Sequence, residues 1–302
     1  MTQAAASANA SAFRSIFRPG LFDGHSVVVT GGGSGIGRCT AHELAALGAR
    51  VALIGRTVQK LDAVAREIAD SGGNASVHPL DIRDEQAVQD GVDAILAEHG
   101  RIDALVNNAG GQFPAPLEQI SSRGWDAVVR NNLTGGFLMS REVYNRHMAQ
   151  HGGAIVNIIA DIWGGMPTMA HSGAARAGML NLTETAACEW GASGVRVNAV
   201  APGWIASSGL DTYGPDTRES FRRLHDVVPL RRFGTESEVS AAIVFLLSPA
   251  AAFITGSCIR IDGGVPNSRH THRRSPEFRV SAATQAFDGF HLASRPKALQ
   301  GL

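Results

Sequence analysis

Short apolar runs alternate with longer segments of helical periodicity between residue 25 and about residue 262. The short runs are rich in Val and Ile and apolar at consecutive positions, as expected for parallel strands covered on both faces. The segments between them, such as 37–47, 58–69 and 85–98, carry apolar residues at the 3.6-residue period of a helix. We therefore expect strands at residues 25–30, 51–55, 75–80, 104–106, 154–159, 196–200 and 258–261.

This alternation predicts an α/β fold: a single Rossmann-type doubly wound parallel sheet of about seven strands, flanked by helices. A sheet of this kind binds its ligand at the carboxyl ends of its strands. The apolar pattern ends after residue 264, and residues 266–302 are polar and interrupted by prolines. We expect a flexible arm over residues 1–20, the sheet domain over residues 21–265 and a polar C-terminal extension over residues 266–302.

Charge and composition exclude several classes of partner. Lys+Arg and Asp+Glu both number 27, so no excess charge points to nucleic acid or to an anionic membrane surface. No apolar run approaches the roughly 20 residues that span a bilayer. The Ala- and Ser-rich N-terminus has no apolar signal core, and the C-terminal Gln300-Gly301-Leu302 differs from the peroxisomal Ser-Lys-Leu signal. We expect a cytoplasmic protein.

The cysteine and histidine patterns predict no metal site. Cys39, Cys188 and Cys258 are too widely spaced for a disulfide framework or a zinc site. His270 and His272 lie in the polar extension without a further ligand cluster nearby, so an exposed basic segment is the better interpretation.

A glycine-rich segment directly follows the first expected strand and opens the first helix. Its sequence is Thr30-Gly31-Gly32-Gly33-Ser34-Gly35-Ile36-Gly37. Glycines let the backbone turn sharply and approach a pyrophosphate, which sits on the unpaired N–H groups of the helix N-terminus. In this strand–turn–helix context, the segment predicts dinucleotide binding rather than a simple tight turn.

The end of the second strand predicts which dinucleotide is bound. An acidic residue there would accept a hydrogen bond from the ribose 2′-OH of NAD, but the sequence is Gly55-Arg56-Thr57. Arginine is a planar, permanently charged donor that suits a 2′-phosphate. Arg56 therefore favours NADP(H), the alternative being a solvated surface arginine.

Three motifs at these intervals together resemble the short-chain dehydrogenase/reductase family over roughly residues 20–265. They are the glycine segment, Asn107-Asn108-Ala109-Gly110 after the fourth strand and Pro202-Gly203 after the sixth. The resemblance implies an adenine contact from Asp81, a structural and cofactor-lining role for Asn107, a nicotinamide wall at Pro202 and Gly203, and Ser207 opposite the carboxamide. The expected cofactor-binding residues are Thr30, Gly31, Ser34, Gly35, Ile36, Gly37, Arg56, Asp81, Ile82, Asn108, Ala109, Gly110, Asn132, Arg176, Pro202, Gly203 and Ile205.

The resemblance also implies an active-site tetrad of Asn, Ser, Tyr and Lys, of which one member remains. Asn132 matches the family's asparagine, while Ala160 stands at the serine position. Ser172 stands at the tyrosine position and Arg176 at the lysine position. The chain favours arginine over lysine, with Lys60 and Lys297 its only lysines, so composition is one explanation of Arg176 but not of the other two replacements.

These replacements disfavour carbonyl reduction. A ketone becomes an alkoxide that needs a strong proton donor, and a serine hydroxyl is too weak an acid while arginine cannot relay a proton. Reduction of a double bond conjugated to a thioester instead moves negative charge to the thioester oxygen as an enolate. Fixed hydrogen bonds can stabilise that charge, and carbon can be protonated afterwards.

A closer resemblance favours the same chemistry. The segment His171-Ser172-Gly173-Ala174-Ala175-Arg176-Ala177-Gly178, together with Gly111-Gln112-Phe113 and residues 155–159 and 246–251, is similar to the peroxisomal trans-2-enoyl-CoA reductase branch and its bacterial relatives. This resemblance implies an acyl-CoA substrate and NADPH. The related 2,4-dienoyl-CoA reductases also lack the tyrosine.

The sequence leaves the proton source open. Tyr213 lies in the expected substrate lid, about residues 204–230, and either reaches the thioester or only packs the lid. Asp161 is an acid just past the fifth strand, although helix capping or surface exposure also explains it. His171 is better interpreted as structural, and water is a fourth option. Trp163, Met166 and Met169 flank the cleft segment as acyl-pocket, core or interface residues.

We therefore expect an NADPH-dependent oxidoreductase that reduces the C2–C3 double bond of an enoyl-CoA, with Asn132, Arg176, Ser172, Tyr213 and Asp161 as candidate catalytic residues. The alternatives are a 2,4-dienoyl-CoA or atypical carbonyl reductase of the same fold, and a non-catalytic NADP(H)-binding scaffold. Small residues on one face of the helix that starts near residue 172 favour a homo-oligomer, expected to be a tetramer.

Overall fold

A computed structural model describes residues 12–212, 227–265 and 285–299 of the chain. Its centre is a seven-stranded sheet in the order β3-β2-β1-β4-β5-β6-β7, and all neighbouring strands are parallel. The expected doubly wound parallel sheet is confirmed, and each predicted strand overlaps an observed one. The strands are β1 Ser26–Thr30, β2 Arg50–Gly55, β3 Asn74–Pro79, β4 Ala104–Asn107, β5 Gly153–Ile158, β6 Val195–Pro202 and β7 Cys258–Ile261.

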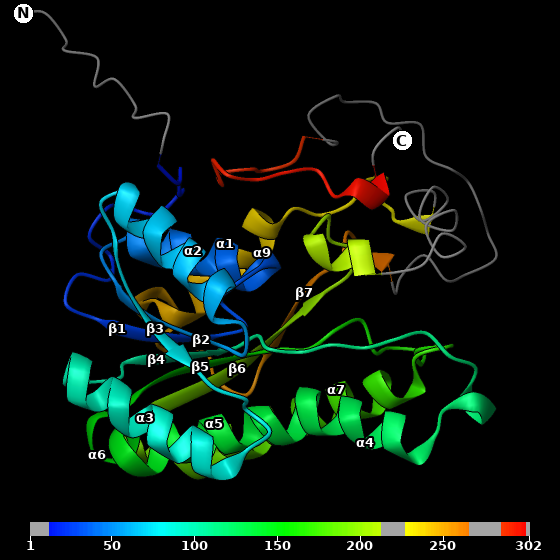
Figure 1. The fold of residues 1–302 in the computed structure, drawn as a ribbon, viewed down its shortest axis with the longest axis horizontal. Helices are drawn as coiled ribbons and strands as arrows, with labels where there is room; N and C mark the ends of the chain where they lie inside the picture. Colours follow the sequence, from blue (N-terminus) through cyan, green and yellow to red (C-terminus); the bar gives the residue numbers. More distant parts are fainter. Residues whose placement is uncertain (1–11, 213–226, 266–284, 300–302) are drawn as a thin grey trace, which may run out of the picture.

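Helices cover both faces of this sheet (Figure 1). Helices α1, α2 and α9 lie on one face, and α3 to α7 lie on the other. Both layers bury apolar side chains, which explains why the strands are apolar at consecutive positions. The helices are α1 Gly35–Ala46, α2 Val58–Asp70, α3 Glu85–His99, α4 Ser122–Val129, α5 Gly135–Val143, α6 Ala149–His151, α7 Ala170–Trp190 and α9 Glu236–Leu247.

The hydrophobic core lies in two layers on either side of β1 and β4. Leu44, Leu53 and Val244 belong to the cluster beneath α1 and α9, whereas Ile95 and Leu105 belong to the cluster beneath α3 and α5. All five side chains are fully buried. Burial of each such side chain contributes roughly 1.5–3 kcal/mol, so the two layers hold the carboxyl ends of the strands in fixed register.

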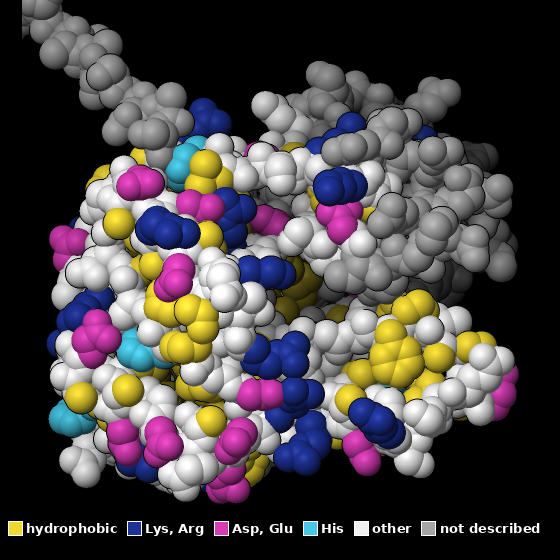
Figure 2. Space-filling model, in the orientation of Figure 1, with side chains coloured by type: hydrophobic (Ala, Val, Ile, Leu, Met, Phe, Trp, Pro, Cys, Tyr) yellow, Lys and Arg dark blue, Asp and Glu magenta, His cyan; other side chains and the backbone are white. Residues whose placement is uncertain are grey.

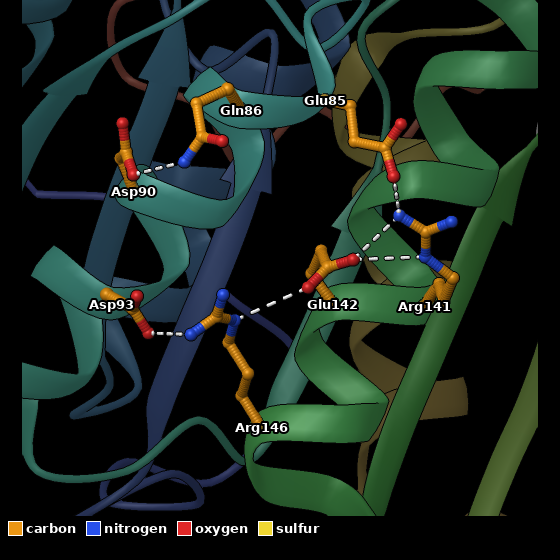
Figure 3. A network of polar contacts seen from close by, with 7 residues as sticks. All are labelled: Glu85, Gln86, Asp90, Asp93, Arg141, Glu142 and Arg146. Atoms are coloured by element: carbon orange, nitrogen blue, oxygen red, sulfur yellow. Dashed lines mark hydrogen bonds and ion pairs between the residues drawn. The ribbon is translucent and has the colours of Figure 1, made fainter.

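Two π-helical turns interrupt the long helical segment that begins with α4. The first, η2 (Arg130–Thr134), joins α4 to α5, and the second, η3 (Tyr144–Met148), joins α5 to α6. Two ion pairs fix this segment against α3: Arg141 contacts Glu85, and Arg146 contacts Asp93. The buried Glu142 of α5 contacts both arginines and so holds them in place (Figure 3). The anchored segment carries Asn132 within η2 and so holds it at one place beside the sheet.

Residues from both ends of the chain pack together on the outer side of α1 and α9. Phe13 and Phe290 are buried, and their ring centroids lie 5.8 Å apart. The N–H groups of Gly289 and Phe290 both donate to the Ser237 hydroxyl on α9. Residues 285–299 of the expected C-terminal extension therefore lie against this chain's own domain (Figure 1).

No helix among residues 12–212, 227–265 and 285–299 has both the length and the hydropathy that crossing a membrane requires.

Candidate functional site

The glycine segment forms a tight turn between β1 and α1. Gly31 and Gly35 have φ of 66° and 58°, a conformation that residues with a side chain rarely adopt. A Cβ on Gly37 would lie against the carbonyl of Gly31. Ser34, the N-cap of α1, makes no side-chain capping hydrogen bond. The first turn of α1 therefore presents its backbone N–H groups as a pyrophosphate site would require.

The loop after β4 is tied to this turn. The Thr30 hydroxyl donates to the Val106 carbonyl and accepts hydrogen bonds from the N–H groups of Asn108 and Ala109. The side-chain amide of Asn108 donates to the Thr30 carbonyl at 2.9 Å. Thr30 and Asn108 thus hold two cofactor-lining loops together, and neither side chain needs to touch the cofactor itself.

A pocket of about 170 Å³ lies at the carboxyl ends of β1, β2 and β4. Seven of the residues expected to bind cofactor line it, which supports the position of the predicted site. They are Gly31, Ser34, Arg56, Asp81, Ile82, Ala109 and Gly110.

Basic and polar groups gather at the β2 side of this pocket. Arg56, Thr57 and Lys60 all line it, and Lys60 was not anticipated from the sequence. Within the described part of the chain, Arg56 makes no hydrogen bond or ion pair, so its guanidinium is available to a ligand. Figure 2 shows Lys and Arg side chains near the middle of this face, where the two helical layers meet.

Asp81 lines the pocket and is also part of an ion pair. Its carboxylate accepts three hydrogen bonds from the Arg83 guanidinium, the shortest at 2.5 Å. These hydrogen bonds lower the pKa of Asp81, so the group is an anion at neutral pH. The pairing fixes Asp81 at the rim where the resemblance implies an adenine contact.

Asn132 is buried and links the loop after β4 to α4 by hydrogen bonds. Its amide donates to the carbonyls of Gly111 and Val128 at 2.7 and 2.9 Å, and its oxygen accepts from the Gly111 N–H. Its side chain is 3% exposed. Asn107 is likewise buried and bonds to Ser140 and Asn157. Both asparagines thus shape the loops around the site, and the amide hydrogens of Asn132 are already used.

Arg176 reaches from α7 to the end of β5. Its guanidinium donates to the Ile158 carbonyl, and its Nε is enclosed without a hydrogen-bond partner among the described residues. Burial lowers the pKa of Arg176 to about 10, so the group keeps its charge at neutral pH. A Cβ on Gly110 would lie 2.6 Å from both Arg176 Nη2 and Asn132 Oδ1. Gly110 is therefore needed to bring these two side chains beside the pocket.

Ser172 is fully buried and points to the loop after β4. Its hydroxyl donates to the Gln112 side-chain oxygen at 2.6 Å. Its backbone N–H donates to Nδ1 of His171, which is buried and packs edge-on against Phe113 at 4.5 Å. The hydroxyl proton of Ser172 is thus committed to Gln112, a residue that sequence reasoning did not select because the pair is 60 positions apart.

The remaining candidates for proton donation are placed differently. Asp161 follows β5 and is partly exposed, and Tyr213 lies outside the described residues. The chain's second tyrosine, Tyr144, was not a candidate; it stacks on Trp190 with 4.3 Å between centroids and forms a hydrogen bond with Ser193. Trp190 follows Ser172 by eighteen positions on α7, about 27 Å along a helix, so Tyr144 is remote from the site.

Apolar residues that follow β5 pack against a small core cluster. Ile162 and Trp163 pack against buried Ile159 and Met179, and the guanidinium of Arg260 lies 5.4 Å from the Trp163 ring. A Cβ on Gly173 of α7 would lie 3.2 Å from the Met166 Cβ, so Met166 lies beside that turn of the helix. These contacts favour a core-packing role for Trp163, which is one of the alternatives that the sequence left open.

The segment after β6 closes the other side. Pro202 ends β6, and a Cβ on Gly203 would lie 2.8 Å from the Asp262 backbone. Ile205 is buried and bridges to Gly234, and its carbonyl accepts from the Ser207 N–H. The close packing holds the backbone of this segment where a nicotinamide wall is expected.

Glu236 starts α9 next to the glycine turn, with Oε1 3.8 Å from where a Gly35 Cβ would lie. Burial raises the pKa of its carboxyl from 4.5 to about 7; Asp288 acts in the same direction and Arg38 against it. The folded state therefore binds this proton more tightly than the unfolded state. The contribution of protonated Glu236 to the free energy of unfolding is present at low pH and is lost as the pH rises toward 7.

We expect the Glu236→Gln variant to become more stable, relative to the parent protein, as the pH rises. Between pH 5 and pH 8, its free energy of unfolding should gain about 1–3 kcal/mol relative to the parent protein. Urea denaturation at several pH values measures this difference, with Glu118→Gln, an exposed glutamate, as the control. Parallel pH profiles for Glu236→Gln and the parent would contradict the assignment.

Comparison with known proteins adds a consistent set of relatives. A family model described as enoyl-(acyl carrier protein) reductase matches residues 31–266. A "probable 2,4-dienoyl-CoA reductase" from Bacillus subtilis (strain 168) is 38% identical over 242 residues, covering 79% of this chain and 95% of that protein. A peroxisomal 2,4-dienoyl-CoA reductase from Danio rerio is 35% identical over 252 residues, which cover 82% of this chain and 84% of that protein.

A solved structure shows higher identity. A citronellol catabolism dehydrogenase (AtuB) from Pseudomonas aeruginosa PAO1 is 61% identical, with a TM-score of 0.76, and the match covers 83% of this chain and 99% of that one.

Proposed function

The chain belongs to the short-chain dehydrogenase/reductase family, and we propose that it uses NADPH to reduce the C2–C3 double bond of a trans-2-enoyl-CoA. Family membership makes it an oxidoreductase with a nicotinamide cofactor. The observation that carries the finer proposal is the hydrogen bond from Ser172 to Gln112 at the place where the family has its tyrosine.

This hydrogen bond argues against ketone reduction. A buried serine hydroxyl that already donates to a side-chain amide has no proton to give to an alkoxide. The neighbouring Arg176 stays charged at neutral pH and cannot relay a proton. The described part of the site therefore lacks the phenol–ammonium pair on which carbonyl reduction depends.

The same hydrogen bond suits enolate chemistry. Bound NADPH would supply the hydride, which adds to C3 of the substrate while charge moves to the thioester oxygen. The bond from Ser172 to the Gln112 oxygen fixes the orientation of the amide group, and in this proposal the amide N–H donates to the thioester oxygen as charge develops there. Ser172 then acts as a positioning residue for Gln112.

Arg176 contributes in a second way. Its guanidinium is held by the Ile158 carbonyl beside Gly110, which lines the cofactor pocket. From there it can donate to ribose hydroxyls and add positive potential near the developing enolate. The proton that completes reduction at carbon comes from water, Asp161 or Tyr213 in this account.

The β2 side of the pocket supports NADPH over NADH. Arg56 and Lys60 bring two positive charges, and the Thr57 hydroxyl is not used to cap α2. A 2′-phosphate is recognised by such charged and hydroxyl donors. Lys60 thus adds a second cation to the one that the sequence predicted.

The Ser172→Ala variant tests whether Ser172 orients Gln112 for the reaction. Without the hydroxyl, the Gln112 amide loses its orienting bond, and we expect kcat for crotonyl-CoA to fall about tenfold, roughly the effect of one hydrogen bond. The affinity for NADPH, followed by fluorescence titration, should not change. A Ser172→Ala enzyme with parental kcat would show that the bond has no role in the reaction.

The named relatives keep two alternatives open to experiment. The 2,4-dienoyl-CoA reductases support an acyl-CoA substrate with one more double bond, while the citronellol catabolism dehydrogenase supports a methyl-branched chain or an alcohol. NADPH oxidation is therefore to be measured with straight and methyl-branched enoyl-CoAs, dienoyl-CoAs, 3-oxoacyl-CoAs and ketones, and NADP⁺ reduction with citronellol.

Turnover of enoyl-CoAs alone supports the proposal. Turnover restricted to ketones, alcohols or dienoyl-CoAs would replace it with the corresponding alternative, and cofactor binding without any turnover would favour the scaffold. A homotetramer and a cytoplasmic location are part of this proposal and are tested by light scattering and by cell fractionation.

A further inference from the structure

Three side chains cluster at the edge of the sheet, outside the candidate site. His78 lies on the edge strand β3, and Glu98 and His99 lie in the last turn of α3. One ring nitrogen of each histidine and one oxygen of Glu98 all lie within 4.8 Å of one another. We propose that this His–Glu–His cluster binds one divalent transition-metal ion of the Zn²⁺ class and fastens β3 to α3.

The two imidazoles converge on a single point. Nε2 of His78 and Nε2 of His99 each lie 2.8 Å from the Ser76 hydroxyl. Two imidazoles and a carboxylate form a donor set that Zn²⁺ accepts, with water or the Ser76 hydroxyl as the fourth ligand.

Neighbouring groups orient the proposed ligands. Nδ1 of His99 lies 2.7 Å from the Ser26 hydroxyl, and as the donor in that bond it leaves Nε2 free of hydrogen. Arg50 donates to Oε1 of Glu98 at 3.2 Å, while Oε2 lies 3.5 Å from Nε2 of His78. Metal-binding histidines and carboxylates carry such outer partners, which fix the tautomer and the rotamer.

The position of the cluster indicates a structural ion. Ser26 and Arg50 begin β1 and β2, whereas the cofactor pocket lies where these strands end. An ion there would join the edge strand to a helix without touching the reaction. Binding should raise Tm and leave kcat unchanged, because only the folded chain assembles the three ligands.

Calorimetric titration of the metal-free full-length protein with Zn²⁺ tests the proposal. We expect one site assigned to the cluster, an increase in Tm of about 5 °C at a hundredfold excess over Kd, and binding weakened about tenfold or more in Glu98→Gln and His99→Gln. Glu98 is half exposed, so Glu98→Gln decides the question even if His99→Gln fails to fold. His151→Gln is the matched control, since His147 and His151 form another histidine pair with stacked rings.

Zinc-soaked crystals locate the ion independently. An anomalous peak between His78 and His99 supports the proposal. No measurable Zn²⁺ binding, unchanged affinity in Glu98→Gln, or a peak at the His147–His151 pair would overturn it.

Discussion

Gln112→Ala should lower kcat/KM for a trans-2-enoyl-CoA by about 10²–10³-fold, the effect of removing one donor that faces a developing oxyanion. The structure makes Gln112 the side chain that the buried Ser172 hydroxyl orients, at a 2.6 Å contact. The loss should appear mainly in kcat, because charge on the thioester oxygen grows only as hydride is transferred. Stopped-flow measurement of NADPH oxidation with crotonyl-CoA gives both constants.

Two controls make this result specific. Gln119→Ala removes an exposed glutamine from the 3₁₀ turn Leu117–Gln119 and should behave like the parent enzyme. NADPH affinity should be the same in Gln112→Ala and in the parent, since Gln112 is not among the residues that line the cofactor pocket. A Gln112→Ala enzyme that retained full kcat/KM would remove Gln112 from the mechanism.

Arg56→Asp should reverse the cofactor preference. It replaces a guanidinium at the end of β2 by a carboxylate that repels a 2′-phosphate and accepts from a ribose 2′-OH. We expect KM for NADPH to rise about 100-fold, since a hydrogen bond to a charged group is worth about 1.5–3 kcal/mol and repulsion adds to its loss. KM for NADH should fall. Initial rates with the two cofactors at fixed enoyl-CoA measure the preference.

The matched control for this charge reversal lies on α2, the helix that follows Arg56. Arg66→Asp changes the same charge at an exposed position of α2 that does not line the pocket. It should leave both KM values unchanged. If Arg56→Asp still preferred NADPH, phosphate recognition would have to come from Lys60 and Thr57 alone.

The sequence predicted the fold closely because its signals are local. All seven strands were expected within two residues of their observed ends, since Val- and Ile-rich runs buried on both faces have few alternative conformations. The glycine turn and the position of Arg56 were also predicted from short stretches of sequence, because each directly follows a strand. Lys60 was missed, because it lies in the first turn of α2 and only the turn from β2 into that helix brings it beside Arg56 at the pocket.

Contacts between distant segments could not be predicted in the same way. The Ser172–Gln112 hydrogen bond forms only where the loop after β4 meets the start of α7. Neither segment carries a sequence pattern that indicates its contact with the other. The His–Glu–His cluster joins β3 to the end of α3 only once the sheet has formed. Asn132 was expected to organise the active site, and this stays a prediction; what the sequence did not indicate is the π-helical turn that directs its amide to the Gly111 carbonyl.

The position of hydride transfer tests the central claim most directly. The protein is incubated with NADPH deuterated at C4 and with a trans-2-enoyl-CoA, and the acyl product is examined by NMR and mass spectrometry. Reduction of the C2–C3 double bond, favoured here by the Ser172–Gln112 pair, predicts a saturated acyl-CoA with deuterium at C3. An unlabelled, unreduced enoyl-CoA, accompanied by deuterium at the carbinol carbon when a ketone is supplied instead, would contradict it.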